Sequence, residues 1–161
     1  STDITIPSDY LSACLKQAGG RVPTGAGKKT YKEATQTMIW IEQDDFPIIV
    51  NGKPISFAKI KDKLMGELSF PKHLVAVREA GFDLDARRAK IGMSKHVRVR
   101  PKFVDWKISG TLEVQDDSAL PEKSLHNIFA IAGRCGLGDW RPGGKSPGRF
   151  GQFEAVVKRA K

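Results

Sequence analysis

Four segments of the chain repeat apolar residues every three or four positions, which predicts amphipathic helices. The predicted ranges are residues 8–19, 58–68, 71–80 and 121–135. Residue types that start and stop helices bound them: Pro121 suits a first helical residue, and Gly81 and Gly136 suit helix ends. The helices nearest the two ends of the chain have the clearest apolar faces.

Two further segments have strand patterns. Residues 35–42 contain a near-continuous apolar run, Met38–Ile41, which is typical of a central strand. Asn51-Gly52 separates the apolar runs 46–50 and 53–57. Because an Asn-Gly pair favours two residues with positive φ, this pattern predicts a β-hairpin with a type I′ turn.

The longest strand pattern, over residues 95–114, places basic side chains on one face. These side chains are His96, Arg98, Arg100 and Lys102. They alternate with two valines and Phe103, so we expect the apolar side chains to face a core. The alternation changes phase, which predicts a β-bulge near residues 104–105 or a corner at Pro101. The basic face is either a phosphate-binding surface or an edge strand that its charge protects from aggregation.

The order of these elements predicts an α+β fold. The end of the chain is expected to run strand, helix, glycine-rich loop and closing strand, the last over Phe153–Val157. The simplest architecture is a ferredoxin-like antiparallel sheet with helices on one face. We expect residues 1–161 to form one domain, with the hairpin and helices around 44–94 as an insertion. Residues 82–94, basic in character, have no pattern that assigns a structure.

A glycine-rich segment near the end of the chain is the strongest candidate site. Seven glycines and two prolines lie within residues 133–153, which rules out a helix or an ordinary strand. Such a loop can turn its backbone N–H groups outward toward an anion, and its aromatic rings can stack on bases. The candidate nucleic-acid-binding residues here are Arg134, Gly136, Gly138, Trp140, Arg141, Lys145, Arg149 and Gly151. A flexible linker is also rich in glycine. The predicted helix before the segment and strand after it favour a shaped loop.

Charge indicates the class of partner. The 161 residues contain 27 Lys and Arg against 18 Asp and Glu, a formal charge of +9 with a pI near 9.7. This balance favours a polyanion, and we expect RNA or single-stranded DNA as the partner, with no cofactor. Residues 95–161 carry 13 basic and 7 acidic side chains, which makes the terminal part the more basic.

Other features limit the compartment and the chemistry. No apolar run reaches the ~18 residues that span a bilayer, so we expect a cytoplasmic protein without membrane contact. Cys14 and Cys135 lie far apart and lack zinc-site spacing, which predicts reduced thiols and no metal site.

Three segments of the chain add a resemblance to known families. Residues 6–15, residues 98–106 and the glycine-rich segment from Ala132 to Phe153 resemble an uncharacterised family of small proteins encoded by tailed phages and prophages. The pattern is also similar to the RAMP superfamily, the ferredoxin-like RNA-binding subunits of CRISPR effector complexes with a C-terminal glycine-rich loop. Arg149–Phe153 loosely resembles the aromatic strand motif of RRM domains, although that motif does not close the RRM chain. The resemblance implies RNA binding, a mobile-element origin and other protein subunits in a nucleoprotein assembly.

Departures from the RAMP pattern favour binding over cleavage. A longer insert separates Gly136–Gly138 from Gly151–Phe153, and no histidine stands in the early position of the processing nucleases. The leading hypothesis is a non-catalytic nucleic-acid-binding protein. The alternatives are a metal-independent endoribonuclease that uses His96 or His126 as acid or base, and a phage structural or protein-interaction subunit.

Overall fold

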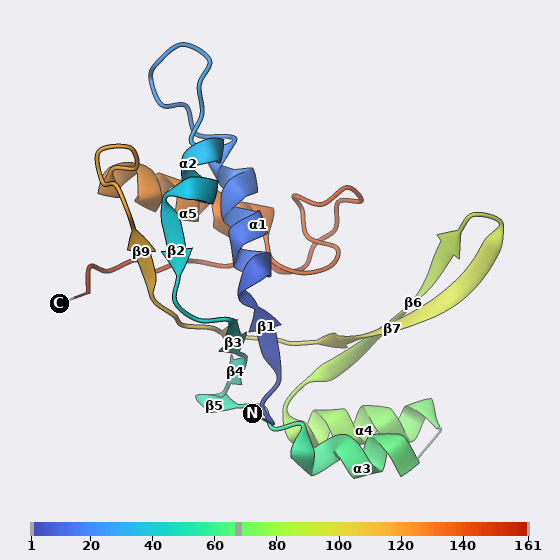
Figure 1. Cartoon of the computed structure of the whole chain (residues 1–161). Helices are drawn as coiled ribbons and strands as arrows, with labels where there is room; N and C mark the ends of the chain where they lie inside the picture. The colour runs from blue at the N-terminus through green and yellow to red at the C-terminus, as the bar shows by residue number, and fades with distance from the viewer. Residues whose placement is uncertain (1, 67–68, 161) are drawn as a thin grey trace. The chain divides into compact units, whose positions relative to one another are not determined.

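The computed structural model describes residues 2–66 and 69–160. In chain order its elements are β1 (Thr5–Pro7), α1 (Ser8–Gly19), α2 (Lys32–Thr37), β2 (Ile39–Ile41), β3 (Asp45–Pro47), β4 (Ile49–Val50), β5 (Lys53–Pro54), α3 (Ala58–Gly66), α4 (Phe70–Ala80), β6 (Asp83–Ile91), β7 (Ser94–Lys102), β8 (Trp106–Lys107), β9 (Leu112–Val114) and α5 (Glu122–Cys135) (Figure 1). The chain divides into two compact units, described separately below. Unit 1 is Ser1–Ile6 with Phe46–Ser109, and unit 2 is Pro7–Asp45 with Gly110–Lys161.

The fold is α+β with several small sheets. Among the described residues the strands pair as β1–β3, β2–β9, β5–β4–β8 and β6–β7, so the predicted single ferredoxin-like sheet is not found. The physical reason lies at Asp105, whose φ of 52° breaks the predicted 95–114 strand. The resulting strands β7, β8 and β9 have three different partners: β6, β4 and β2.

Two other strand predictions need correction. Residues 35–42 form the end of helix α2 and the short strand β2, and the side chain of Trp40 in that strand is 61% exposed. The predicted closing strand at Phe153–Val157 is irregular backbone. Its first N–H donates to the carbonyl of Gly133 at 3.0 Å, so this segment returns along α5 instead of joining a sheet.

Unit 1 is built around a small apolar core and confirms the predicted hairpin. The buried cluster comes from the hairpin region, α3, α4 and the residue before β6: Ile48, Ile55, Ile60, Val77 and Phe82. At the hairpin turn Asn51 has φ 52° and Gly52 has φ 75°, the two positive values of a type I′ turn. The predicted helices are found as α3 and α4, although residues 67–68 lie outside the described part of the chain.

Helices α1 and α5 form the core of unit 2, as their apolar spacing predicts. Their buried side chains are Cys14, Leu15, Ala18, Leu125, Ile128, Phe129, Ala132 and Cys135. The Cys14 thiol donates a hydrogen bond to the Ala132 carbonyl at 3.3 Å, which ties one helix to the other. Both cysteines are free and buried. Within residues 2–66 and 69–160, no helix is long and apolar enough to cross a membrane.

The burial of the thiols leads to a first prediction. Burial, and then the neighbouring Cys135, raise the pKa of Cys14 to about 12, while Arg141 lowers it. At pH 8 the thiol of the folded protein is therefore protonated and shielded, and the thiolate is the reactive form. Ellman's reagent should modify Cys14 only slowly in native protein and should modify two thiols at once after denaturation. Rapid labelling of two thiols in the native state, or none after denaturation, would contradict this.

The same pKa predicts how stability depends on pH. An unfolded cysteine loses its proton near pH ~8.5, whereas folded Cys14 keeps its proton up to about 12. Between these values the unfolded state binds fewer protons, so the free energy of unfolding should decrease as pH rises from about 9 toward 12. The measurement is urea unfolding across this range, with Cys14→Ala as the control that should show a shallower decrease. Equal slopes for the two proteins would contradict the assignment to Cys14.

Candidate nucleic-acid interface

A two-stranded β-ribbon in unit 1 holds most of the predicted basic strand. Strands β6 and β7 pair in antiparallel register over nine positions, from Asp83 opposite Lys102 to Ile91 opposite Ser94. We call residues 83–102 the arm. Figure 1 shows it projecting from α3 and α4, with its turn at the far end. Gly92, with φ 59°, makes that turn.

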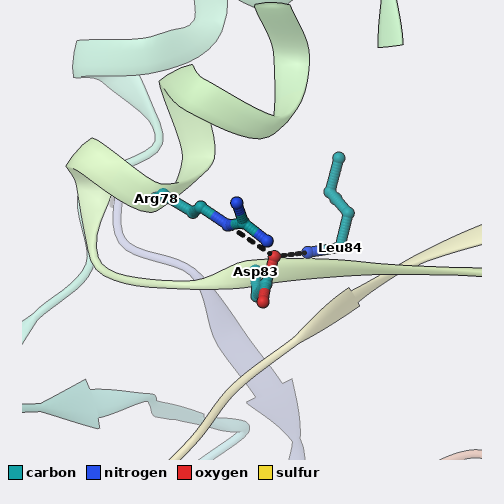
Figure 2. A network of polar contacts seen from close by, with 3 residues as sticks. All are labelled: Arg78, Asp83 and Leu84. Atoms are coloured by element: carbon teal, nitrogen blue, oxygen red, sulfur yellow. Dashed lines mark hydrogen bonds and ion pairs between the residues drawn. The ribbon is translucent and has the colours of Figure 1, made fainter. Parts of the chain in front are cut away.

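The root of the arm is fixed to the core of unit 1. The rings of Phe82 and Phe103, which flank the two strands, stack with centroids 5.2 Å apart. The Asp83 carboxylate accepts a hydrogen bond from the Leu84 N–H at 2.9 Å and pairs with the Arg78 guanidinium of α4 at 3.1 Å (Figure 2). The Leu84 N–H first, and then Arg78, hold the pKa of Asp83 below its usual value. The carboxylate therefore stays charged at neutral pH and fixes the arm to α4.

Near the root, opposite charges face each other across the strands. Asp83 lies opposite Lys102, and Asp85 lies opposite Arg100. Such pairs stabilise a ribbon by a fraction of a kcal/mol, roughly 0.2–1. The register therefore gives Arg100 and Lys102, two of the predicted phosphate contacts, a role in holding the strands together.

Farther from the root, like charges face each other. Arg87 lies opposite Arg98, and Lys90 lies opposite Lys95. Directly opposed like charges destabilise a strand pair. We call Arg87, Arg88, Lys90, Lys95 and Arg98 the distal cluster. Residues 86–98 contain no Asp or Glu. The carboxylate of Asp85, just before this range, lies 2.9 Å from Arg87.

The structure of the arm corrects the prediction for two valines and assigns a strand to residues that the sequence left open. Val97 and Val99 were expected to face a core, but they are 68% and 47% exposed, because a two-stranded ribbon has no layer packed on its second face. Of the apolar residues predicted to face a core, Phe103, beyond the strand, packs against it, as does Leu84 of β6 at the root of the arm. Residues 82–94, which had no assigned structure, supply strand β6. The signal that could have found it is Gly92-Met93 between two basic alternating runs, a pattern typical of a two-residue hairpin turn.

The glycine-rich loop, in unit 2, is folded onto itself. The Leu137 N–H donates to the Gly151 carbonyl at 2.9 Å, and the Phe150 N–H donates to the Trp140 carbonyl at 3.0 Å. The N–H groups of Gly143, Gly144 and Gly148 also bond to carbonyls of residues 135 and 141. The sequence analysis expected outward-facing N–H groups, but these five N–H groups donate to carbonyls of the loop and of α5 instead.

Close backbone contacts explain why several of the loop positions are glycine. A Cβ at Gly151 would lie 1.8 Å from the Leu137 carbonyl oxygen, and a Cβ at Gly148 would lie 2.1 Å from that of Trp140. A Cβ at Gly133 would lie 2.1 Å from the Phe153 carbonyl oxygen. No side chain fits at these distances, so these glycines let two backbone segments touch.

Of the other predicted loop residues, some side chains contact the loop itself and the rest are exposed to solvent. Trp140, with φ 56°, is half-buried, and its ring stacks on Phe150 with centroids 6.5 Å apart and planes 10° apart. This favours the ring as an anchor of the loop over a free platform for a base. Arg141 donates to the Gly138 carbonyl at 2.9 Å. Arg134, Lys145 and Arg149 are exposed.

Unit 2 also has a basic cleft that the sequence did not reveal. It has a volume of about 470 Å³. Its lining residues are Ala13, Lys16, Gln17, Gly20, Arg21, Lys32 and Arg141. Four of these carry a positive charge and none carries a negative one. Arg141 was predicted as a contact, but the three other cations come from the end of α1, the turn after it and the start of α2, and only the fold brings them together.

The charge of the chain is uneven between the two units. Unit 1 contains 14 Lys and Arg against 7 Asp and Glu, whereas unit 2 contains 13 against 11. The formal charges are therefore +7 and +2. The excess lies mainly in the unit that carries the arm, which includes residues 95–109 of the more basic terminal part.

The two candidate catalytic histidines lie in different units. His96 is exposed on the arm, opposite Ala89. His126 is exposed on α5, with its Nε2 atom 3.8 Å from a carboxylate oxygen of Glu122, and Glu122 also pairs with Arg159. In the described part of the chain no three His, Cys, Asp or Glu residues lie together as a metal site.

Comparison of the chain with family models, with curated proteins and with solved structures finds no match.

The loop geometry predicts different costs at two glycines with the same φ. Gly138 (φ 82°) has open space around its Cβ position, whereas Gly151 (φ 80°) faces the Leu137 carbonyl. Gly138→Ala should lower the free energy of unfolding by about 1–2 kcal/mol, the cost of positive φ. Gly151→Ala should cost about 1–3 kcal/mol more, because the backbone must move apart. Urea unfolding measures both, and equal losses would contradict the close contact.

Proposed function

We propose that the protein is a non-catalytic nucleic-acid-binding protein and that the distal cluster of the arm contacts the phosphate backbone. One observation carries the proposal: Arg87 faces Arg98 and Lys90 faces Lys95 on an exposed ribbon whose distal half contains no carboxylate. Lys90 and Lys95 repel each other across the strands, and the Asp85 carboxylate, 2.9 Å from Arg87, offsets only part of the repulsion between Arg87 and Arg98. A polyanion between or beside these cations converts the repulsion into attraction, and phosphate backbones supply such a charge density.

The sequence-based partner, RNA or single-stranded DNA, remains part of this proposal. The basic cleft of unit 2 offers a second surface for phosphates, where Lys16, Arg21 and Lys32 join Arg141. Exposed Arg134, Lys145 and Arg149 add charge to the same unit. The internal hydrogen bonds of the glycine-rich loop favour contacts through these side chains over contacts through backbone N–H groups.

The family relationship and the setting are proposed on the sequence alone. We propose a RAMP-like, ferredoxin-like domain of phage or mobile-element origin that acts in the cytoplasm with other protein subunits. The proposed relationship rests on the motifs near the ends of the chain and at residues 98–106. The α+β class is compatible with that origin. The division of the strands into small sheets gives the finer ferredoxin-like assignment no added support.

Filter binding with a matched charge control tests the arm. The test variant is Arg87→Gln with Arg98→Gln, and the control is Lys28→Gln with Lys29→Gln, which removes the same charge from an exposed loop of unit 2. The slope of log affinity against log salt should fall by about 1.4 units for single strands or about 1.8 for duplex DNA in the arm variant. The control should keep the wild-type slope. An equal decrease of the salt slope in the two variants would contradict the proposal, because it would mean that only the net charge of the protein matters.

A cleavage gel on the same mixtures tests the non-catalytic assignment. Labelled RNA should remain intact over hours at neutral pH. Cleavage that His96→Ala or His126→Ala abolishes would replace the proposal with the endoribonuclease alternative.

A further inference from the structure

We infer that the ligand of the arm is duplex DNA, and that the arm lies in its major groove with cations of both ribbon faces on the two phosphate backbones. The inference rests on the proposed binding of nucleic acid by the distal cluster, and at the arm it replaces the partner expected from the sequence, RNA or single-stranded DNA, with duplex DNA. It is drawn from the register of the arm, its dimensions and its composition.

The register distributes the cations over both faces. Directly opposed residues share a face and successive residues alternate, so Arg87 and Arg98 lie on one face. Arg88, Lys90 and Lys95 lie on the other. A single nucleic-acid strand that follows one face of the ribbon makes no contact with the cations of the other face. A groove with a phosphate backbone on each side can contact the cations of both faces.

The dimensions of the arm fit one groove. Each strand has nine residues, and at about 3.4 Å per residue the ribbon is about 30 Å long, close to one helical turn of B-DNA at about 34 Å. The major groove of B-DNA, about 12 Å wide, admits a two-stranded ribbon, whereas its minor groove is only about 6 Å wide. The major groove of duplex RNA is too deep and narrow to be entered.

Composition separates duplex from single-stranded ligands. Proteins that bind single strands stack bases on aromatic side chains, at roughly 1–3 kcal/mol per base. Residues 83–102 contain no Phe, Tyr or Trp, and their seven Lys and Arg stand against two Asp. The arm therefore offers charge without stacking surfaces. Its root, held by the Phe82–Phe103 stack and the Arg78–Asp83 ion pair, presents that charge in a fixed direction relative to α4.

Fluorescence anisotropy of the full chain tests the ligand. The probes are a 20-bp DNA duplex, the RNA duplex of the same sequence and one of the DNA strands. We expect the DNA duplex to bind at least tenfold more tightly than either other probe at 150 mM salt. Methyl green, a major-groove ligand, should compete with the protein, whereas distamycin, a minor-groove ligand, should not.

Two variants test the faces. Arg87→Gln with Arg98→Gln, and Lys90→Gln with Lys95→Gln, should each lower the salt slope for the DNA duplex by about 1.8 units. Lys28→Gln with Lys29→Gln is the control of equal charge. Lys90→Gln with Lys95→Gln relieves repulsion, whereas Arg87→Gln with Arg98→Gln relieves repulsion but also removes the exposed Asp85–Arg87 ion pair. Both variants should therefore fold with a stability close to that of the wild type, which thermal unfolding checks.

The outcomes separate this inference from the proposed function. If single-stranded DNA binds as tightly as duplex and both arm variants weaken it, nucleic-acid binding stands and the groove inference is wrong. The groove inference, but not the proposed function, would also be wrong if the salt slope for the DNA duplex fell in only one of the two variants, or if distamycin displaced the protein from the duplex. No binding of any probe would overturn both.

Discussion

Repulsion between like charges across the arm is the constraint on which our account depends. Arg87 against Arg98 and Lys90 against Lys95 weaken the pairing of the two strands toward the tip of the ribbon. The root compensates, because opposite charges face each other there and the Phe82–Phe103 stack joins the arm to a buried core. The stable root thus allows the far end to keep a concentration of charge that a polyanion can neutralise.

The glycine-rich loop follows a different principle, close approach of backbone to backbone. Gly148 and Gly151 leave no room for a Cβ. The N–H groups of Leu137, Gly143, Gly144, Gly148 and Phe150 donate to carbonyls of the same loop and of α5. The loop therefore acts first as a rigid structure. It also positions Arg141, which joins three cations of α1, α2 and the turn after α1 at the basic cleft.

Local signals in the sequence predicted local structure well. The hairpin at Asn51-Gly52 and helices α1, α4 and α5 depend on turn residues and apolar spacing within a few positions. Strand β6 was missed because most of its residues face no core and so lack an apolar period. The strand predicted over residues 95–114 was too long because the left-handed backbone at Asp105 divides it. The basic cleft could not be predicted, since its cations are far apart in sequence and meet only through packing. Of the predicted contacts, Arg98 and Arg141 lie where the structure concentrates charge.

The most direct test of the central claim is a titration of ¹⁵N-labelled protein with a 20-bp DNA duplex, followed by amide chemical shifts. Our account predicts that the largest shifts fall on residues 87–98, with smaller ones at the basic cleft. Shifts confined to residues 136–151, with the arm unchanged, would contradict it.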